Sequence, residues 1–447
     1  MKKILLFGAG KSATSLIRYL LDVTAARGWQ LVVAENDLPL AQSKIGGSPQ
    51  ARAVAIDVGR EAERDSLVAA ADIVISLLPP SLHYEVAQSC VKENKSLLTA
   101  SYVDDAVRSL EPEINARGLL FLGEMGLDPG IDHMSALQLI RQIQQRDGEI
   151  ESFYSHTGGL IAPASDNNPW RYKISWNPRN VVLAGSAGAS YLEDGRVMTR
   201  TYQELFDHPG EIRLPALGGL AWYPNRDSLS YIPLYGLKDA KTFIRTTLRY
   251  PAFCTAWKNI VRAGLTDAVT PLGRAAAANR GEAVTTSNAG TVADGGPLTY
   301  AQWATPLLPF VDDANRAQYA FLGLFDKSPV PATAKVSADI LQHLLESRLA
   351  MRPADRDMIV MVHEIGYRRQ GRAYQARSIL RIEGEDSLHT AMARTVGLPL
   401  GIAAVLVLDG RISLSGLHIP ILPAIYDPVM HELEQQGIRF EHTETEG

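Results

Sequence analysis

Short hydrophobic runs alternate with amphipathic windows along roughly the first 130 residues. The hydrophobic runs are KILLF, QLVVA, ARAVAI, DIVISLL, SLLTA and LLFLG. Windows with helical spacing of apolar residues follow them at 11–27, 38–45, 60–70, 82–93, 104–117 and from about 131. Buried strands separated by crossover helices predict a parallel sheet with helices on both faces, which is a doubly wound α/β fold.

The pattern changes after about residue 150, where longer polar segments rich in Gly, Pro, Trp and Tyr begin. Turn residues mixed with aromatic and cationic side chains predict an α+β domain whose loops bind a ligand. The expected later elements are helices at 254–265 and 334–350, strands at 356–367 and 373–384, a helix at 387–397, a strand at 402–408 and a helix near 427–437. A Gly/Ala/Thr-rich stretch at 275–300 predicts a surface insertion.

The composition of the 447 residues, 46% hydrophobic and 21% charged, is that of a globular protein. We find no apolar run near the ~18 residues that cross a bilayer, so we expect a soluble protein with no membrane partner. A net charge of -5 and a pI near 6.1 argue against nucleic acid as a partner. The only cysteines, Cys90 and Cys254, predict neither disulfide nor metal site, which fits a reducing cytoplasm.

The first strand ends in a glycine turn of the form G-x-G-x-x-A, Gly8 to Ala13. Gly8 makes the tight turn, Gly10 lets a pyrophosphate approach the backbone, and Ala13 allows close packing of helix on strand. Lys11 and Ser12 lie where a helix N-terminus offers free N–H donors to phosphate. The turn and its context predict binding of a dinucleotide.

Glu35 ends the second strand, where an acidic side chain accepts hydrogen bonds from the adenosine ribose and repels a 2′-phosphate. We therefore expect NAD or NADP, with a mild preference for NAD. Lys11 and Lys44 could still serve a phosphate from the side. We also place cofactor contacts at Asn36, Asp57 and Val58.

Three later loops follow strands of the same predicted sheet: SLLPP at 76–80, TASY at 99–102 and the loop around Asp128 in GEMGLDPGIDHM. Because ligands bind at the carboxyl ends of parallel strands, these loops should face the same crevice as the glycine turn. Asp128 could cap a helix that starts at Pro129, or it could face the ligand. We assign Asp132 and His133 to the helix N-terminus, as dipole and cap partners.

Several cations of the second region lie among aromatic residues instead of in a charged run. They are Lys173, Arg179, Arg226, Arg245 and Arg249. A guanidinium group suits a carboxylate in bidentate geometry, although any one of these residues could form a structural ion pair. Together they favour an anionic small-molecule substrate.

The sequence resembles the saccharopine dehydrogenases of the glutamate-forming type, also called saccharopine reductases. The resemblance covers nearly the whole chain and lies in ISLLPPSLH, TASYV, GEMGLDPGIDHM, GGLIAP, NNPWRYKISWNP, YPNRDS, RTTLRY and VLDGRIS. It implies interconversion of saccharopine with 2-aminoadipate 6-semialdehyde and glutamate in lysine metabolism, with NAD or NADP. It also implies a homodimer.

The resemblance further implies a division into three domains. Residues 1–132 form the dinucleotide-binding Rossmann domain, on which a C-terminal segment from about 390 to 447 packs. Residues 133–253 and 351–389 form the substrate and dimerisation domain, and residues 254–350 form a helical domain with the insertion.

The family's contacts carry over to specific residues of this sequence. Those with the substrate fall on Ser101, Tyr102, Asp128, Thr157, Arg226, Thr246, Thr247 and Leu248. Those with the nicotinamide and ribose fall on Leu77, Leu78, Pro79, Ala100 and Ser101. The family's YCGGLPAPE is HTGGLIAPA here, so that a tyrosine becomes His156, a cysteine becomes Thr157 and a glutamate becomes Ala164.

Oxidation of a secondary amine needs a group that takes its proton. Asp128 is our first choice, because a carboxylate in a closing cleft attracts the ammonium and has its pKa raised by desolvation. Tyr102 and His156 follow, although a lone histidine beside a strand is more often structural. Two other functions stay open: an imine reductase acting on a carboxylated polyamine such as carboxynorspermidine, and a nucleotide-binding homologue without catalysis.

Overall fold

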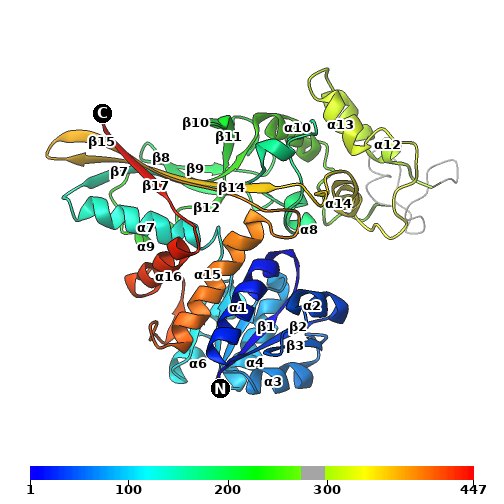
Figure 1. Cartoon of the computed structure of the whole chain (residues 1–447). Coiled ribbons are helices and arrows are strands. Elements are labelled where there is room, and N and C mark those ends of the chain that lie inside the picture. Colours follow the sequence, from blue (N-terminus) through cyan, green and yellow to red (C-terminus); the bar gives the residue numbers. More distant parts are fainter. Residues whose placement is uncertain (273–296) are drawn as a thin grey trace.

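The computed structural model describes residues 1–272 and 297–447, and its first sheet is entirely parallel. Its seven strands lie in the order β16-β6-β5-β4-β1-β2-β3 (Figure 1). They are β1 (Lys3–Phe7), β2 (Gln30–Glu35), β3 (Ala51–Ala55), β4 (Ile73–Ser76), β5 (Ser96–Thr99), β6 (Leu120–Leu122) and β16 (Gly416–His418). The order reverses at β1, which is the doubly wound arrangement. The predicted fold class is confirmed.

Helices cover both faces of this sheet. They are α1 (Thr14–Arg27), α2 (Leu38–Ile45), α3 (Glu61–Ala69), α4 (His83–Lys92), α5 (Asp105–Arg108), α6 (Glu111–Ala116), α15 (Ala391–Leu408) and α16 (Pro423–Gln435). Side chains of α1, α2 and α15 share one core cluster, and those of α3, α4 and α6 share another. The single helix predicted over 104–117 is wrong, since Pro112 opens a separate helix, α6.

A second sheet of ten strands lies beyond the first. Its main path is β10 (Gly210–Leu214), β11 (Gly218–Pro224), β13 (Thr242–Arg249), β7 (Glu149–Ile161), β14 (Asp357–Arg369), β15 (Arg372–Glu383) and β17 (Glu441–Glu446). The strands β8 (Ala189–Glu193), β9 (Arg196–Arg200) and β12 (Arg226–Asp227) lie off this path. The C-terminal strand β17 pairs with β15, so the expectation that the whole C-terminal segment packs on the Rossmann domain is wrong at its end.

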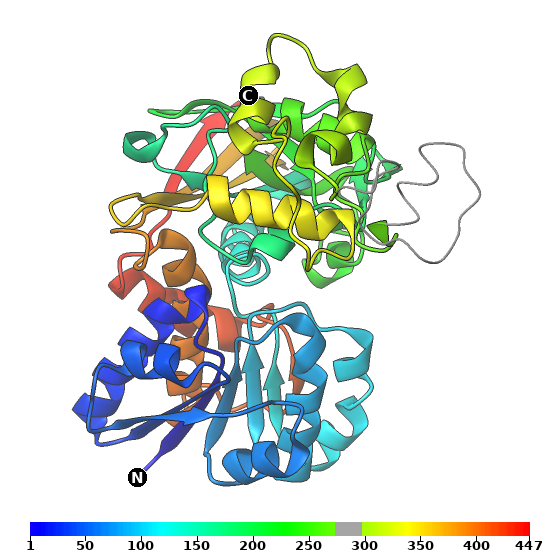
Figure 2. The ribbon, with the colours of Figure 1, turned by 90° about the vertical axis from the view of Figure 1, so that its right-hand side faces the viewer.

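A helical region lies at one end of the second sheet (Figures 1 and 2). Its helices are α8 (Pro178–Val182), α10 (Pro251–Arg262), α12 (Tyr300–Trp303), α13 (Arg316–Leu322) and α14 (Ser337–Arg348). Trp170, Trp257 and Tyr319 are fully buried in its core cluster, which also takes in Ala221 and Tyr223 of β11. Most of the predicted insertion at 275–300 lies outside the described residues.

The helix α15 corrects two sequence predictions. It runs unbroken over Ala391–Leu408, so the strand expected at 402–408 is wrong, and so is the statement that no apolar run approaches 18 residues. Its mean hydropathy is 1.9, enough to span a membrane by length and composition, yet 72% of it is buried inside the protein. It packs on α1, α16 and β14, and a helix buried on all sides can be apolar all round, which hides its helical period.

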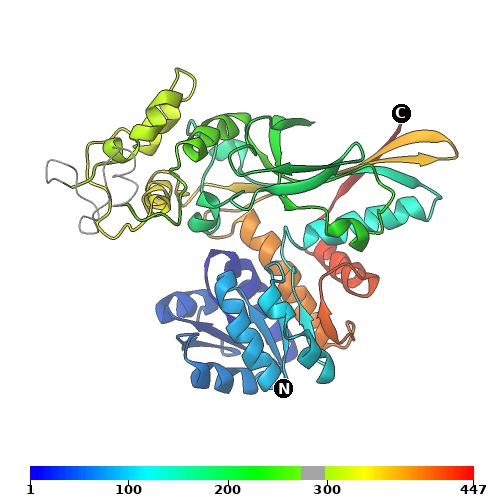
Figure 3. The same ribbon diagram turned by 180° about the vertical axis from the view of Figure 1, so that it is seen from behind.

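The helices α15 and α7 (Ile131–Gln144) lie between the two sheets (Figures 1 and 3). The carboxyl ends of β1, β4, β5 and β6 point toward the second sheet, as Figure 3 shows from behind. The loops after these strands therefore lie against side chains of the second sheet. The short helix α9 (Tyr231–Leu234) packs in the same core cluster.

Candidate active site

The glycine turn after β1 has the geometry that a dinucleotide needs. Gly8 has φ +98°, and a Cβ there would lie 2.9 Å from the carbonyl oxygen of Leu77. A Cβ at Gly10 would meet no other heavy atom within 4 Å among the described residues. The first glycine is thus required by packing, and the second leaves open space beside the backbone. A pyrophosphate fits such a cradle at the start of a helix.

Glu35 accepts hydrogen bonds from backbone N–H groups of the glycine turn and of its own loop. Its Oε2 accepts the N–H of Ala9 at 2.6 Å, and its Oε1 accepts the N–H of Asn36 at 2.9 Å. Lys44 donates to the carbonyl oxygen of Gly10 at 2.5 Å and to the hydroxyl of Thr14 at 2.9 Å. Burial lowers the pKa of Lys44 to about 8. A carboxylate and an ammonium group therefore both lie at the turn.

His83 connects the loops after β4 and β5. Its Nδ1 lies 2.9 Å from the hydroxyl of Ser76, and its Nε2 lies 2.8 Å from the hydroxyl of Ser101. Burial lowers the pKa of His83 to about 4, so the ring is neutral near pH 7. Sequence analysis missed this residue, although it ends the motif ISLLPPSLH. It fixes the predicted substrate contact Ser101 relative to β4.

A buried charged cluster forms where the Asp128 loop meets β13. The Nη2 of Arg245 lies 2.7 Å from Oδ1 of Asp128, 2.8 Å from Oδ2 of Asp132 and 3.1 Å from the hydroxyl of Tyr102. The hydroxyl of Tyr102 also donates to Asp128 at 3.1 Å. Asp128 does not cap α7, which begins at Ile131 with Gly130 before it. The capping alternative is therefore wrong, and contact of Asp128 with a ligand stays a prediction.

The two aspartates of the cluster differ in pKa. Desolvation by burial raises the pKa of Asp128 above its ordinary value, although the charge of Arg245 opposes this. Burial acts on Asp132 too, but His133, Arg245 and the backbone N–H of Gly130 hold the pKa of Asp132 below its ordinary value. Asp128 is therefore the carboxylate of the pair that holds a proton more readily.

A second buried layer supports the cluster. His133 lies 2.9 Å from Oε2 of Glu124 through Nε2 and 2.6 Å from the hydroxyl of Tyr235 through Nδ1. The hydroxyl of Tyr231 donates to the same Glu124 oxygen at 3.1 Å. Asp132 accepts the N–H of Gly130, as a cap partner does, but it also pairs with Arg245. The helix-terminus role predicted for Asp132 and His133 is thus only part of what they do.

A pocket of about 350 Å³ opens beside the cluster. Tyr102, Ser190, Arg226 and Tyr231 are among its lining residues. The guanidinium carbon of Arg226 lies 5.1 Å from the centre of the Tyr102 ring, and Arg226 is exposed. An anionic group in this pocket can therefore contact Arg226 while the rest of its molecule touches Tyr102, whose hydroxyl reaches Asp128.

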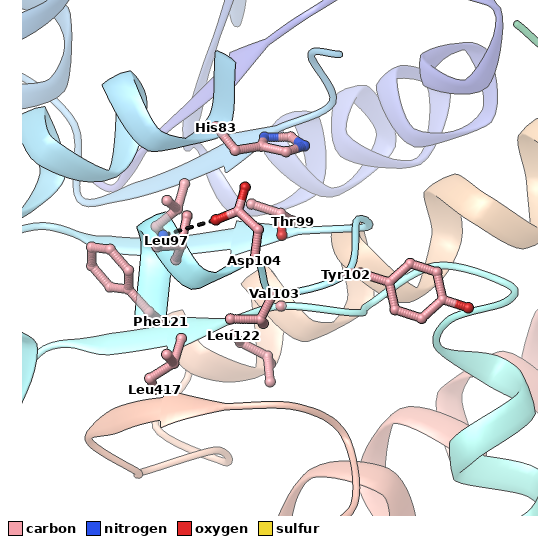
Figure 4. A pocket seen from close by; sticks show the side chains of 11 residues that line it. His83, Leu97, Thr99, Tyr102, Val103, Asp104, Phe121, Leu122 and Leu417 are labelled. Atoms are coloured by element: carbon pink, nitrogen blue, oxygen red, sulfur yellow. Dashed lines mark hydrogen bonds between the residues drawn. The ribbon is translucent and has the colours of Figure 1, made fainter. Parts of the chain in front are cut away.

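A second pocket lies under the loops after β5 and β6 (Figure 4). Its lining includes His83, Thr99, Tyr102 and Asp104, but its accessible volume is only about 20 Å³. Figure 4 shows the hydroxyl of Tyr102 pointing away from the other labelled side chains. This space is too small for a ligand of several heavy atoms, and the larger pocket is the candidate substrate site.

The structure separates His156 from the charged cluster. In the sheet register Arg245 pairs with Ser155, and Thr246 pairs with His156. Because successive side chains point to opposite faces of a strand, His156 lies on the other face from Arg245. Its ring is hydrogen-bonded to Thr246 at 2.7 Å and lies 3.3 Å from Glu364. This geometry does not support a role of His156 in proton transfer at Asp128.

The predicted substrate stretch on β13 divides between the two faces. Thr246 and Leu248 point to the face of His156, where Leu248 is fully buried. Thr247 shares the face of Arg245 and pairs with Thr157 on β7. The hydroxyl of Thr157 is buried and has no hydrogen-bond partner in the described part of the chain. Among these predicted substrate contacts, Thr157 and Thr247 are therefore the ones whose side chains lie on the same face as Arg245.

Of the remaining predicted cofactor contacts, Leu77 and Leu78 lie against Gly8, and Asp57 and Val58 follow β3 at the same end of the sheet. Cys90 and Cys254 are buried and free. The searched residues contain no group of three or more His, Cys, Asp or Glu side chains that could hold a metal ion. The roles of the individual site residues stay predictions.

Comparison with known proteins assigns the family. The family model described as saccharopine dehydrogenase NADP binding domain matches residues 4–122, and that described as saccharopine dehydrogenase C-terminal domain matches residues 126–438. A curated relative, the saccharopine dehydrogenase (NADP(+), L-glutamate-forming) of Saccharomyces cerevisiae, is 34% identical over 457 residues, which cover 97% of each chain.

The mitochondrial alpha-aminoadipic semialdehyde synthase of Mus musculus is 33% identical over 98% of this chain. This chain spans only 47% of that relative, about half its length. Among solved structures, apo saccharopine dehydrogenase (L-Glu forming) from S. cerevisiae has a TM-score of 0.84 and 32% identity, with 100% of both chains covered. A homospermidine synthase from Legionella pneumophila, at 9% identity and TM-score 0.57 over 99% of this chain and 91% of that one, shares the fold. This chain belongs to the saccharopine dehydrogenase family.

Proposed function

We propose that this protein is an NADP-dependent saccharopine dehydrogenase of the L-glutamate-forming type. Saccharopine, NADP+ and water give 2-aminoadipate 6-semialdehyde, glutamate, NADPH and a proton, or the reverse. The observation that carries the proposal is the cluster of Arg245, Asp128 and Tyr102. It joins the loops at the coenzyme end of the first sheet to the second sheet, beside a pocket with an exposed arginine.

NADP is our choice of coenzyme, and the mild preference for NAD predicted from Glu35 is not supported. That prediction assumed a carboxylate free to accept hydrogen bonds from a ribose, whereas both Glu35 oxygens accept backbone N–H groups. Lys44 places an ammonium group at the same turn. The relatives from two yeasts carry NADP(+) in their names. The nicotinamide ring, when bound, accepts hydride from the carbon beside the substrate nitrogen.

Asp128 is the group that takes the proton from the substrate amine in this proposal. A dialkyl amine is mostly protonated at neutral pH, and its lone pair must be free before hydride leaves the adjacent carbon. Burial raises the pKa of Asp128, which brings it closer to the working pH than an exposed aspartate. Arg245 holds this carboxylate in place, and Tyr102 donates to the same oxygen. Addition of water to the imine needs a second proton transfer, and the oxygens of Asp128 and Tyr102 are the groups at hand for it.

Arg226 anchors a carboxylate of the substrate in the pocket. It is exposed, lines the pocket and has no carboxylate partner among residues 1–272 and 297–447. A free guanidinium at the wall of a pocket suits a carboxylate. It also disfavours a cationic polyamine as substrate.

Steady-state assays on the purified protein test the proposal. We expect formation of NADPH, followed at 340 nm, from saccharopine and NADP+, with a higher kcat/KM than with NAD+. Turnover of carboxynorspermidine alone would replace the substrate in this proposal. Binding of NADPH without turnover of either compound would show a homologue without catalysis.

Two further properties are proposed, the first from the resemblance and the second from the two cysteines. We propose a homodimer, which light scattering on the eluted protein tests by mass. We also propose a reducing, cytoplasmic location. The free, buried state of Cys90 and Cys254 is compatible with it.

A further inference from the structure

Ser76, His83 and Ser101 form a chain of hydrogen bonds that the proposed function does not use. Ser76 ends β4 and is fully buried, His83 is the first residue of α4 and is only 4% exposed, and Ser101 lies half-buried in the loop after β5. The hydroxyl of Ser76 lies 2.9 Å from Nδ1 of His83, and that of Ser101 lies 2.8 Å from Nε2. The imidazole ring therefore joins the carboxyl ends of two parallel strands, at the edge of the sheet where the coenzyme is expected.

The surroundings of His83 keep its ring neutral. Burial lowers its pKa to about 4, although the carboxylate of Asp104 acts in the opposite direction. The ring also belongs to the first residue of α4, and the partial positive charge of a helix N-terminus disfavours a cation there. A neutral imidazole has one N–H group and one bare nitrogen, so it donates one hydrogen bond and accepts the other.

The hydroxyl of Ser76 decides which nitrogen of His83 carries the proton. Ser76 is 0% exposed, and in the described part of the chain its hydroxyl has no hydrogen-bond partner other than His83. If the ring proton were on Nδ1, Ser76 would accept it, and the buried O–H of Ser76 would have no acceptor, which costs folding free energy. Ser76 therefore donates to Nδ1, and the proton of the ring lies on Nε2.

A proton on Nε2 leaves the hydroxyl of Ser101 free to donate. Nε2–H donates to the oxygen of Ser101, so this oxygen is an acceptor toward His83 and its own proton points elsewhere. Within residues 1–272 and 297–447 the Ser101 hydroxyl has no second hydrogen bond. The carbonyl oxygen of Ser101 accepts the N–H of Glu124 at 3.0 Å, which holds this loop against the loop of Asp128. The free O–H group therefore lies beside the candidate active site.

We propose that His83 is a positioning residue, which makes the hydroxyl of Ser101 a hydrogen-bond donor to the bound ligand. The inference rests on the proposed function, because the ligand is the coenzyme or the substrate of that reaction. The acceptor is an oxygen of the nicotinamide carboxamide or of a substrate carboxylate. Hydrogen bonds that run in one direction, from Ser76 through His83 to Ser101, polarise one another, so the ring also makes Ser101 a stronger donor.

Two substitutions of His83 separate this role from a structural one. In His83→Gln the side-chain amide reaches the place of Nε2 and donates to Ser101, but Ser76 loses its acceptor. In His83→Asn the amide reaches the place of Nδ1 and accepts from Ser76, but no group donates to Ser101. We expect the lower Tm in the Gln variant and the lower kcat/KM for saccharopine in the Asn variant, about 3- to 10-fold below the wild type. The same order of the two variants in both measurements would show that the ring only supports the fold.

Substitution of Ser101 shows whether the effect of His83 passes through its hydroxyl. We expect Ser101→Ala to lower kcat/KM about 10-fold, and His83→Asn to have no further effect in the Ser101→Ala protein. Additive losses would contradict the proposal. Calorimetry identifies the acceptor: a weaker Kd for NADPH in both single variants assigns the carboxamide, and a weaker Kd for saccharopine alone, measured with NADPH present, assigns a substrate carboxylate. Unchanged Kd values for both ligands would rule out the contact.

The tautomer of His83 separates this inference from the proposed function. Nitrogen NMR of protein labelled with 15N-histidine, in which the His83 signals are those lost in His83→Gln, is expected to show the ring proton on Nε2 at pH 7. A proton on Nδ1 would overturn the inference even if saccharopine is turned over. If saccharopine is not turned over, but the proton is on Nε2 and NADPH binds more weakly to Ser101→Ala and His83→Asn, the function fails and the positioning role stands.

Discussion

Two arginines on β13, Arg245 and Arg249, face the same side of one sheet but lie in opposite electrostatic surroundings. Arg245 contacts two aspartates and a tyrosine hydroxyl, and its charge is more than neutralised. Arg249 lies between aromatic rings with no carboxylate at hand in the described residues. The first guanidinium group is neutralised by carboxylates of the chain itself, whereas the second is buried without a counter-charge in the described residues. A buried arginine is a candidate for ligand binding when no carboxylate of the chain lies within reach of its guanidinium group.

The same substitution at both arginines gives the sharpest contrast. In Arg245→Met, Asp128 and Asp132 stay buried without their cation, and breaking a buried ion pair in this way costs about 3–5 kcal/mol of unfolding free energy. In Arg249→Met no anion is left behind, so we expect no loss. Urea denaturation of the two variants and the wild type measures both values.

Equal losses in the two variants would remove the distinction between the regions. Asp132→Asn together with Arg245→Met is a useful control, because it removes one of the stranded charges. We expect it to recover part of the stability lost in Arg245→Met.

The unfolding free energies of these variants should be compared at a pH where other buried groups do not titrate. Titration of His83 sets the lowest usable pH. Burial lowers the pKa of His83 to about 4 from 6.5, so the unfolded chain binds a proton between these values that the folded protein does not. The stability contributed by the neutral ring is therefore complete above about pH 6.5 and is lost as the pH falls toward 4. The shift corresponds to about 3 kcal/mol at most.

Comparison of wild type and His83→Gln by urea denaturation at pH 7 and pH 4.5 checks this expectation. The wild type should lose more stability than the variant on acidification. An identical loss in both proteins would show that His83 does not remain neutral.

Substitution of Thr157 should give the smallest effect. Thr157 lies beside Thr247, which is between the two arginines on β13. Its hydroxyl is buried without a partner in the described residues, so Thr157→Val should change the unfolding free energy by less than about 1 kcal/mol. If a bound substrate supplies the partner, KM for saccharopine should rise by about 2- to 10-fold with kcat nearly unchanged. Unchanged KM in this variant would place Thr157 outside the substrate site.

The first domain could be predicted from sequence because its signals are local. Each buried strand is a short apolar run, and the glycine turn has a fixed spacing that the backbone geometry of Gly8 and Gly10 explains. The helix α15 could not, since burial on all sides removes the periodicity on which the prediction depends. The edge strand β17 is polar and exposed at every position, so it carried no strand signal either.

The candidate site was only partly accessible to sequence analysis. Asp128 and Tyr102 were found from their place after parallel strands, which is a topological rule. Arg245 was picked out only as one of several cations, and its pairing with Asp128 is a contact across 117 positions that no local pattern contains. His156 was a candidate because histidine is a common proton-transfer group in enzymes. Its strand register decides instead, and the available signal was alternation with Arg245 once the two strands are known to pair.

The pH dependence of kcat in the wild type and in Asp128→Asn, with saccharopine and NADP+, tests whether Asp128, held by Arg245, takes the proton of the substrate amine. We expect the wild-type kcat to fall on the acid side as Asp128 becomes protonated, at a pH above the ordinary aspartate range because burial raises its pKa. The variant should lose about 10²- to 10⁴-fold in kcat and this acid limb, with unchanged affinity for NADPH. A variant that keeps the wild-type kcat across the pH range would show that another group takes this proton.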